Sequence, residues 1–311
     1  MKKTEFSFIG DIASMFGSLP HHGFEPIGDD CTVLPMGDDA LVMSTDMLIE
    51  DVHFLRGASS AEEVGYKSLM VNISDVAAMG ATPTATLLSL SLPESAQGEW
   101  SEGFMRGFHE GCKEYGIALV GGDTTASRDR IAINVVAIGR AAKSCVKRRS
   151  AAQVGDLICV TGKLGTSSKG LVDIMFGDLN TVAAKAHRRG QARIAEGRFL
   201  GTCEAVHAMM DISDGIASDI KHIMEQSGVG AEIELSKIPT DYDIRYATTG
   251  GEDYELLLTI AGDKFEEVAT ALLNTTGTPL TAIGRITEGD TLQWLDNGQP
   301  SELELKGFTH F

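Results

Sequence analysis

Six short acidic motifs are spread along this chain, and most of them stand beside glycine or another small residue. No set of basic motifs of comparable density balances them. Hard cations such as Mg²⁺ take oxygen ligands, and a few carboxylates commonly hold them together with substrate phosphates. The pattern therefore indicates a metal-dependent enzyme that acts on phosphates. The motifs are Gly28-Asp29-Asp30, Ser44-Thr45-Asp46, Asn72-Ile73-Ser74-Asp75, Gly121-Gly122-Asp123-Thr124, Asp211-Ile212-Ser213-Asp214-Gly215 and Gly250-Gly251-Glu252-Asp253.

Segments with alternating strand and helix patterns separate these motifs in the first half of the chain. The expected order is β-α-β-α-β-β, which predicts a mixed sheet with helices on one face. Strands are expected over residues 40–46, 84–92, 117–120 and 131–139, and helices over 61–80 and 99–115.

The second half reads as another α/β unit. At ~150 residues per domain, a chain of 311 residues predicts two domains. We place them at residues 1–142 and 143–311, because a basic segment follows residue 142. Strands are expected over 157–161, 206–212, 231–235, 255–260 and 281–286, helices over 216–226 and 264–273, and a Gly/Ser loop over 162–170.

The charge balance argues against polyanionic partners. Lys and Arg number 26 against 44 Asp and Glu, a net charge of −18. Nucleic-acid binding relies on Lys and Arg to neutralise phosphates, and so does binding to an anionic membrane surface. We therefore expect neither partner, and a phosphate substrate would need metal ions as the intermediary.

The scattered cysteines are typical of a reducing compartment, and the apolar runs are too short to span a membrane. The five cysteines are scattered without a CxxC pair or a Cys/His cluster, so neither a zinc site nor a disulfide framework is expected. No apolar run approaches the ~20 residues that span a bilayer. These observations predict a cytoplasmic protein.

Asp46 and Asp75 are the strongest single candidates for metal ligands. Asp46 is expected at the carboxyl end of a strand, where ligands gather in α/β sheets. Asn72 and Asp75 are three residues apart, so both fall on one face of the expected helix. Their neighbours are apolar, and a carboxylate there is costly unless it is paired or binds a cation.

The glycine pair before Asp123 suggests a phosphate site. Gly121 and Gly122 would let the backbone approach a phosphate closely, and Asp123 could hold the bridging metal.

Each motif also has a plain structural explanation. Asp46 could cap a helix, Asp75 could lie on a solvated face, and Asp123 and Glu252 could belong to tight turns. Capping accounts for one of Asp211 and Asp214 but not for both.

Several known phosphate and hydrolase motifs are absent. The glycines at 165 and 170 have P-loop spacing, but Leu171 stands where lysine is needed. The protein-kinase motifs and the G-x-S-x-G nucleophile elbow are missing as well. Phosphate chemistry would therefore need another architecture.

Taken together, the motifs resemble the thiamine-monophosphate kinases, a family of the aminoimidazole-ribonucleotide-synthetase-like superfamily. The resemblance covers nearly the whole chain, and its strength lies in six blocks in order with near-family spacing. Besides the six motifs, it rests on Val52-His53-Phe54, on Val76-Ala77-Ala78-Met79-Gly80-Ala81 and on the ending Gly307-Phe308-Thr309-His310-Phe311.

The resemblance implies ATP-dependent phosphorylation of thiamine phosphate to thiamine diphosphate by in-line transfer with several Mg²⁺ ions. It also implies a fold of two α/β domains with mixed sheets, in which the first domains of two subunits form a barrel in a homodimer. Its implied metal ligands are Asp30, Ser44, Thr45, Asp46, Asp75, Asp123, Asp211 and Asp214, of which Asp46, Asp75, Asp123 and Asp214 are the catalytic candidates. Gly122, Asp123, Arg149 and Ser213 would meet ATP, and His53, Glu252 and Phe308 would meet thiamine phosphate.

Three positions depart from the family pattern. Asp51 stands where glycine is frequent, Phe308 replaces Trp or Tyr, and residues 187–193 lack prolines. These departures concern substrate affinity more than the reaction.

Two other classes remain open from the sequence. One is a sister ATP-dependent enzyme such as an aminoimidazole ribonucleotide synthetase, and the other is a non-catalytic protein that binds thiamine phosphate or a nucleotide. A shared metal site makes a geometric demand, since catalytic metal pairs sit only ~3.5–4 Å apart. The aspartates must then converge in one cleft between the domains, with His53 and Glu252 at its substrate end.

Overall fold

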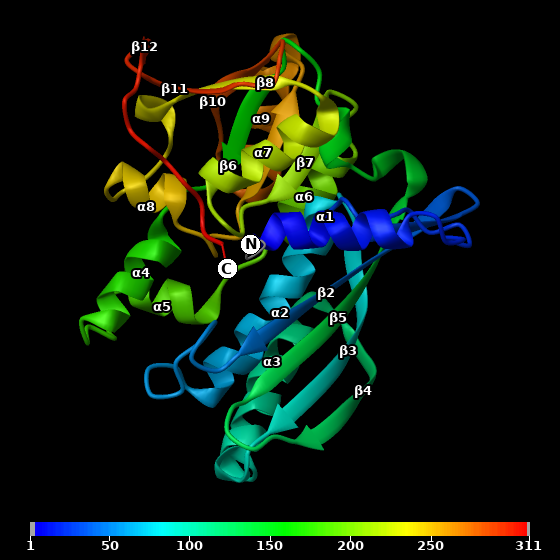
Figure 1. Ribbon diagram of the computed structural model, residues 1–311, viewed down its shortest axis with the longest axis vertical. Coiled ribbons are helices and arrows are strands. Elements are labelled where there is room, and N and C mark those ends of the chain that lie inside the picture. The colour runs from blue at the N-terminus through cyan, green and yellow to red at the C-terminus, as the bar shows by residue number, and fades with distance from the viewer. Residues whose placement is uncertain (1–3, 310–311) are drawn as a thin grey trace.

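The structure is a computed structural model that describes residues 4–309, so His310 and Phe311 of the aromatic ending lie outside the described residues. Within residues 4–309 the strands form two mixed sheets, one from each half of the chain (Figure 1). In this part of the chain no helix combines the length and the apolar character needed to cross a bilayer.

The first sheet has the strand order β1-β2-β5-β3-β4. All neighbours pair antiparallel except β3 and β4, which run parallel. Its strands are β1 (Thr32–Met36), β2 (Asp39–Ile49), β3 (Thr82–Leu92), β4 (Ala118–Ala126) and β5 (Ala132–Ala142).

Helices α2 (Ala61–Ala78) and α3 (Glu99–Tyr115) pack against each other beside this sheet (Figure 1). Helix α2 begins at a capping box, in which the Ser60 and Glu63 side chains each bind the other's backbone N–H. A Cβ at Gly107 of α3 would lie 1.9 Å from the backbone oxygen of Glu62, so the two helices approach more closely than any larger residue allows. Phe104 and Phe108 of α3 are fully buried in the resulting core.

The second sheet has the order β12-β11-β8-β10-β6-β9-β7. Its strands are β6 (Leu157–Thr161), β7 (Val206–Asp211), β8 (Gly230–Glu234), β9 (Leu256–Ile260), β10 (Leu280–Thr287), β11 (Leu292–Asp296) and β12 (Gln299–Pro300). The helices of this half are α4 (Thr166–Met175), α5 (Val182–Arg189), α6 (Ile194–Gly201), α7 (Ile216–Ser227), α8 (Ile244–Thr249) and α9 (Phe265–Thr276). Short 3₁₀ segments lie at Glu94–Ala96, Lys143–Cys145, Arg149–Ala151, Leu235–Lys237 and Gly262–Lys264.

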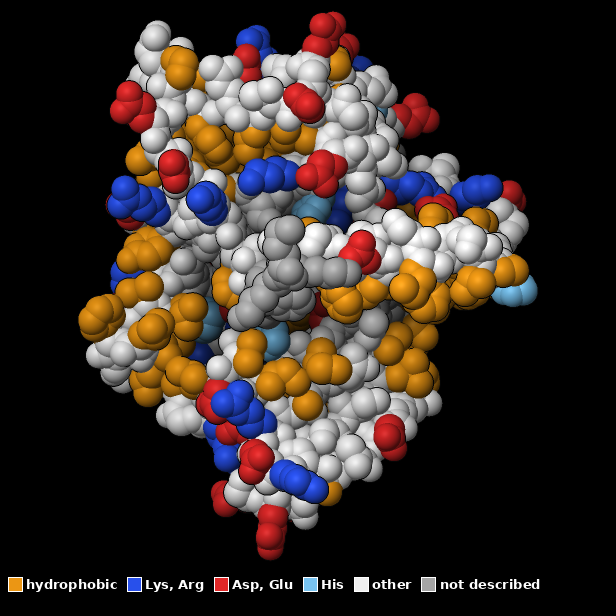
Figure 2. Space-filling view, viewed as in Figure 1, with side chains coloured by type: hydrophobic (Ala, Val, Ile, Leu, Met, Phe, Trp, Pro, Cys, Tyr) orange, Lys and Arg blue, Asp and Glu red, His pale blue; other side chains and the backbone are white. Residues whose placement is uncertain are grey.

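Helix α1 (Glu5–Phe16) crosses the front of the molecule in Figure 1 and buries none of its residues. Figure 2 shows hydrophobic side chains exposed along this helix, and Phe8, Met15 and Phe16 are among the exposed residues. The sequence did not predict α1 or β1.

Three sequence predictions of local structure are wrong. Asp46 does not end its strand, because β2 continues to Ile49. The expected Gly/Ser loop over 162–170 contains the start of α4 at Thr166. Gly121 to Asp123 lie inside β4 rather than in a turn after it.

Gly122 has a packing role inside β4. A Cβ at Gly122 would lie 1.8 Å from the backbone oxygen of Leu88, next to the irregular register between Thr86 and Leu87 of β3. Glycine is needed here because the two strands approach closely.

Candidate active site

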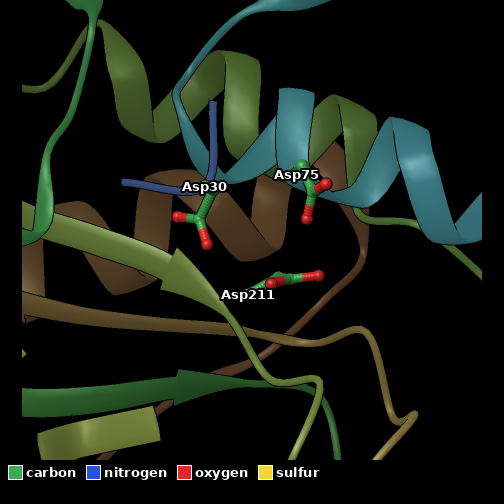
Figure 3. A group of neighbouring side chains, drawn as sticks. All are labelled: Asp30, Asp75 and Asp211. Carbon is green, nitrogen blue, oxygen red and sulfur yellow. The ribbon is translucent and has the colours of Figure 1, made fainter. Parts of the chain in front are cut away.

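Three aspartates from distant parts of the chain converge on one space. Asp30 lies in the segment before β1, Asp75 on α2 and Asp211 at the end of β7. One carboxylate oxygen of each lies within 4.8 Å of the others, and Figure 3 shows the side chains gathered from these elements. The two halves of the chain therefore contribute to a single carboxylate cluster.

Short polar contacts fix the orientation of the cluster. The Ser44 hydroxyl donates to Asp75 Oδ2, and the Ser74 hydroxyl donates to Asp211 Oδ2 over 2.6 Å. Arg149 forms a salt bridge with Asp30. The other Asp30 oxygen, Oδ2, is buried and has no hydrogen-bond partner among the described residues.

Burial and mutual repulsion destabilise the charged form of these carboxyl groups. Burial is the largest cause that raises the pKa of Asp30 and of Asp75, and neighbouring aspartates raise the pKa of Asp75 further. Burial, followed by the charge of Asp30, raises the pKa of Asp211 to about 8. Carboxylate oxygens so close together suit a hard divalent cation, which would relieve the repulsion.

Asp46 belongs to the same electrostatic group. Burial, followed by the charge of Asp30, raises its pKa to about 6, and Asp46 in turn raises the pKa of Asp75. Its backbone N–H donates to Asn72 Oδ1 over 2.9 Å. Helix α2 thus holds Asp46 through Asn72, one turn before Asp75. Thr45 is exposed, and its hydroxyl accepts from Asn134 Nδ2 over 2.9 Å.

Asp123 does not meet the cluster within one chain, which corrects the expectation that all six aspartates converge there. The cross-strand row Met47–Asn134–Ser89–Asp123 runs over β2, β5, β3 and β4. Three strand spacings of ~4.8 Å separate Asp123 from Met47 by roughly 14 Å. Asp123 is exposed on the edge strand, and the neighbouring Gly122 is exposed with it.

Asp214 and Ser213 lie in the turn between β7 and α7, with Ser213 exposed. The backbone N–H of Phe308 donates to the Asp214 carbonyl over 3.1 Å, which brings the C-terminal segment to this turn. The Phe308 side chain itself is 51% exposed.

Sequence reasoning missed Asp219, a buried residue in α7. Its Oδ1 accepts from the Asp214 backbone N–H at 3.4 Å, and its Oδ2 has no partner among the described residues. Burial, followed by the charges of Asp214 and Asp211, raises its pKa well above the usual range. An aspartate at helical spacing among apolar residues could have flagged it.

His53 and Glu252 occupy another part of the site. The Ile49 N–H donates to His53 Nδ1 over 3.0 Å, so the neutral ring carries its proton on Nε2. Glu252 follows Gly250-Gly251 and has a backbone φ of 65°, a left-handed value that costs energy outside glycine. The charge of His53 acts on Glu252, which indicates that the two side chains face the same region.

The chain is similar to known proteins over most of its length. The model of the AIR synthase related protein N-terminal domain matches residues 28–141, and that of the C-terminal domain matches residues 153–295. The chain is similar to the thiamine-monophosphate kinase of Haemophilus influenzae, with 36% identity over 92% of this chain and 91% of that protein. It is 33% identical to the thiamine-monophosphate kinase of Bacillus subtilis over 94% of this chain and 95% of that protein.

A solved structure is similar to this chain over its whole length. The structure of AaThiL complexed with AMPPCP and TMP is 32% identical, covers 100% of this chain and 99% of its own, and superposes with a TM-score of 0.86. The predicted α/β fold with mixed sheets is therefore confirmed.

The cluster predicts an unusual pH dependence of stability without metal. Asp46 and Asp211 have folded pKa values of about 6 and about 8, above the ordinary 3.8, so the folded protein binds protons more tightly than the unfolded chain. Stability is then greatest at low pH and falls as pH rises from about 4 to about 8, by on the order of 3 kcal/mol for Asp46 alone. Urea unfolding in EDTA measures this fall, and added Mg²⁺ should reduce it.

Asp75→Asn should shrink both the pH dependence and the Mg²⁺ effect, because it removes one charge from the cluster. Asp290→Asn, at an exposed position, is the matched control and should change neither. A metal-free protein whose stability rises steadily over this pH range would contradict the cluster's electrostatics.

Proposed function

The chain belongs to the thiamine-monophosphate kinase family of AIR synthase related proteins, and from this membership we propose that it phosphorylates thiamine phosphate to thiamine diphosphate with ATP. The observation that carries the proposal is the carboxylate cluster of Asp30, Asp75 and Asp211, which brings oxygens from both halves of the chain within 4.8 Å of one another. A cluster of this kind is costly to bury without a cation, so it is best explained by a metal-assisted reaction.

Asp30, Asp75 and Asp211 would hold Mg²⁺ ions, with Asp46 beside them. Ser44, whose hydroxyl donates to Asp75, would add its oxygen, and Thr45 and Asp214 are the remaining oxygen ligands of the proposal. When bound, the ions would offset the repulsion between the γ-phosphate and the acceptor phosphate and stabilise the charge of the in-line transition state.

Arg149 is the residue best placed to meet ATP. Its guanidinium is mostly buried and anchored to Asp30, and its Nε, 3.9 Å from Asp29 Oδ1, makes no hydrogen bond among the described residues. A fixed guanidinium binds phosphate oxygens through several N–H groups at once. Ser213 stands exposed on the neighbouring turn and would contribute a hydroxyl.

The acceptor would be held at the other end of the site by His53, Glu252 and Phe308. The acceptor phosphate is already an anion, so the reaction needs no general base to deprotonate it. His53 would therefore position its substrate by donating a hydrogen bond from Nε2 to a phosphate oxygen. Phe308 offers an exposed ring for stacking.

A homodimer would bring Asp123 to the site. Strand β1 pairs only with Asp39–Met43 of β2, so Ser44–Ile49 of β2 has a strand, β5, on one side only. Strand β4 is an edge strand exposed along its whole length. If β4 of each subunit lies along β2 of the other, the two sheets close into a barrel without open edges. The partner subunit's Asp123 would then lie beside Asp46.

The reaction itself is the first test of this function. Incubation with ATP, Mg²⁺ and thiamine phosphate should yield ADP and thiamine diphosphate one for one, and EDTA should abolish both. Asp46→Asn should lower turnover by about a hundredfold or more, roughly 3 kcal/mol of transition-state stabilisation, while leaving the fold intact. Phosphorylation of free thiamine but not of thiamine phosphate would overturn the assignment.

Mixing two inactive variants tests the shared site. Asp46→Asn and Asp123→Asn should each be nearly inactive alone. After subunit exchange, half of the dimers are mixed, and each mixed dimer has one site with both wild-type residues. Activity should then recover to about a quarter of the wild-type value. No recovery, despite proven exchange, would place Asp123 outside the partner's site.

A further inference from the structure

Lys67 is a buried cation that has no role in the reaction proposed above. It lies in the middle of α2, and its side chain is only 3% exposed. Its ammonium lies 2.9 Å from Glu252 Oε1, across the boundary between the two halves of the chain. A buried lysine is expensive unless it is paired, so this contact with Glu252 accounts for its place in the fold.

The Glu252 carboxylate is held from several directions. The Lys67 ammonium contacts Oε1, and the Tyr254 hydroxyl donates to the same oxygen at 3.4 Å. His187 Nδ1, on α5, lies 3.4 Å from Oε2. Burial, followed by the charge of Lys67, lowers the pKa of His187 to about 4, so His187 is neutral near pH 7 and Lys67 supplies the positive charge.

Close contacts and left-handed φ values fix the backbone conformation around Glu252. Its N–H donates to the Ser213 carbonyl over 2.8 Å. A Cβ on Gly251 would lie 2.0 Å from that same carbonyl oxygen. Glu252 and Tyr254 both have left-handed φ values, 65° and 52°. Strained backbone of this kind persists only where surrounding contacts over-determine it.

Helix α2 ties this residue to the metal cluster. Lys67 and Ser74 are seven residues apart and share a face, about 10 Å from each other along the axis. Ser74 binds Asp211, and Lys67 binds Glu252. One rigid helix therefore sets the separation between the proposed phosphoryl-transfer centre and the acceptor end.

We propose that Lys67 is a positioning residue, which fixes the Glu252 carboxylate toward the organic end of the acceptor and so sets the affinity for that substrate. This inference rests on the proposed function. Thiamine phosphate offers a carboxylate both a thiazolium cation and an amino group, and a carboxylate that can swing away would bind either one poorly. Lys67 acts through Glu252 and does not touch the phosphates.

The test compares Lys67→Met with Lys147→Met. Lys147 is a matched control, because it is also a buried lysine (8% exposed), and its ammonium donates to the Cys203 and Val206 carbonyls over 2.8 Å rather than to Glu252. Steady-state kinetics should show that Lys67→Met raises the KM for thiamine phosphate by about tenfold or more with an unchanged KM for ATP. Lys147→Met should leave the KM for thiamine phosphate unchanged, and Lys67→Arg should restore most of the loss.

A double variant tests whether Lys67 acts through Glu252. Glu252→Gln should raise the KM for thiamine phosphate, and adding Lys67→Met should change it less than about twofold further, because the two residues act as one unit. If Lys67→Met does not fold, Lys67→Gln and Lys147→Gln replace the pair, with the same expectations.

The outcomes separate the two claims. A wild-type protein that does not act on thiamine phosphate overturns the proposed function. If the wild type is active but Lys67→Met has the same kinetics as Lys147→Met, the function stands and the role of Lys67 is wrong. Independent, multiplying effects of the Lys67 and Glu252 substitutions would also overturn it.

Discussion

Repulsion among buried carboxylates is the constraint on which this structure depends. Asp30, Asp75 and Asp211 approach within 4.8 Å, and the nearest fixed positive charge is Arg149 on Asp30. Such a group raises the pKa values of its members and lowers the stability of the metal-free fold. Cations bound between these carboxylates would relieve the repulsion. The fold must also hold together two halves of the chain that each place negative charge at their common boundary.

Helix α2 is the element that holds the two halves of the chain together. Its residues bind partners in both halves: Asn72 holds the backbone of Asp46, Ser74 holds Asp211, and Lys67 holds Glu252. The helix is buried along most of its length and packs closely on α3, so these contacts keep fixed spacings. The carboxylate cluster and the proposed acceptor end are therefore parts of one rigid frame.

The sequence predicted the outline of the site but not how every part is placed. Asp30, Asp75 and Asp211 were identified because carboxylates recur beside small residues, and the helical spacing placed Asn72 and Asp75 correctly on one face. The expected end of the strand before Gly121 was wrong, because β4 continues through Asp123 and Gly122 serves close strand packing against Leu88, a contact that no local pattern reveals. Lys67 and Asp219 were missed, since their importance comes from partners far away in sequence.

The most direct test of the central claim is to locate the metals. Anomalous scattering from Mn²⁺, in crystals grown with a non-hydrolysable ATP analogue, should show peaks within ligand distance of Asp75 that are shared with Asp30 and Asp211. Their carboxylates should lie around the metal as they lie around the shared space in Figure 3. Mn²⁺ bound elsewhere, with no peak at Asp75 in a protein that still turns over its substrates with Mn²⁺, would contradict the account.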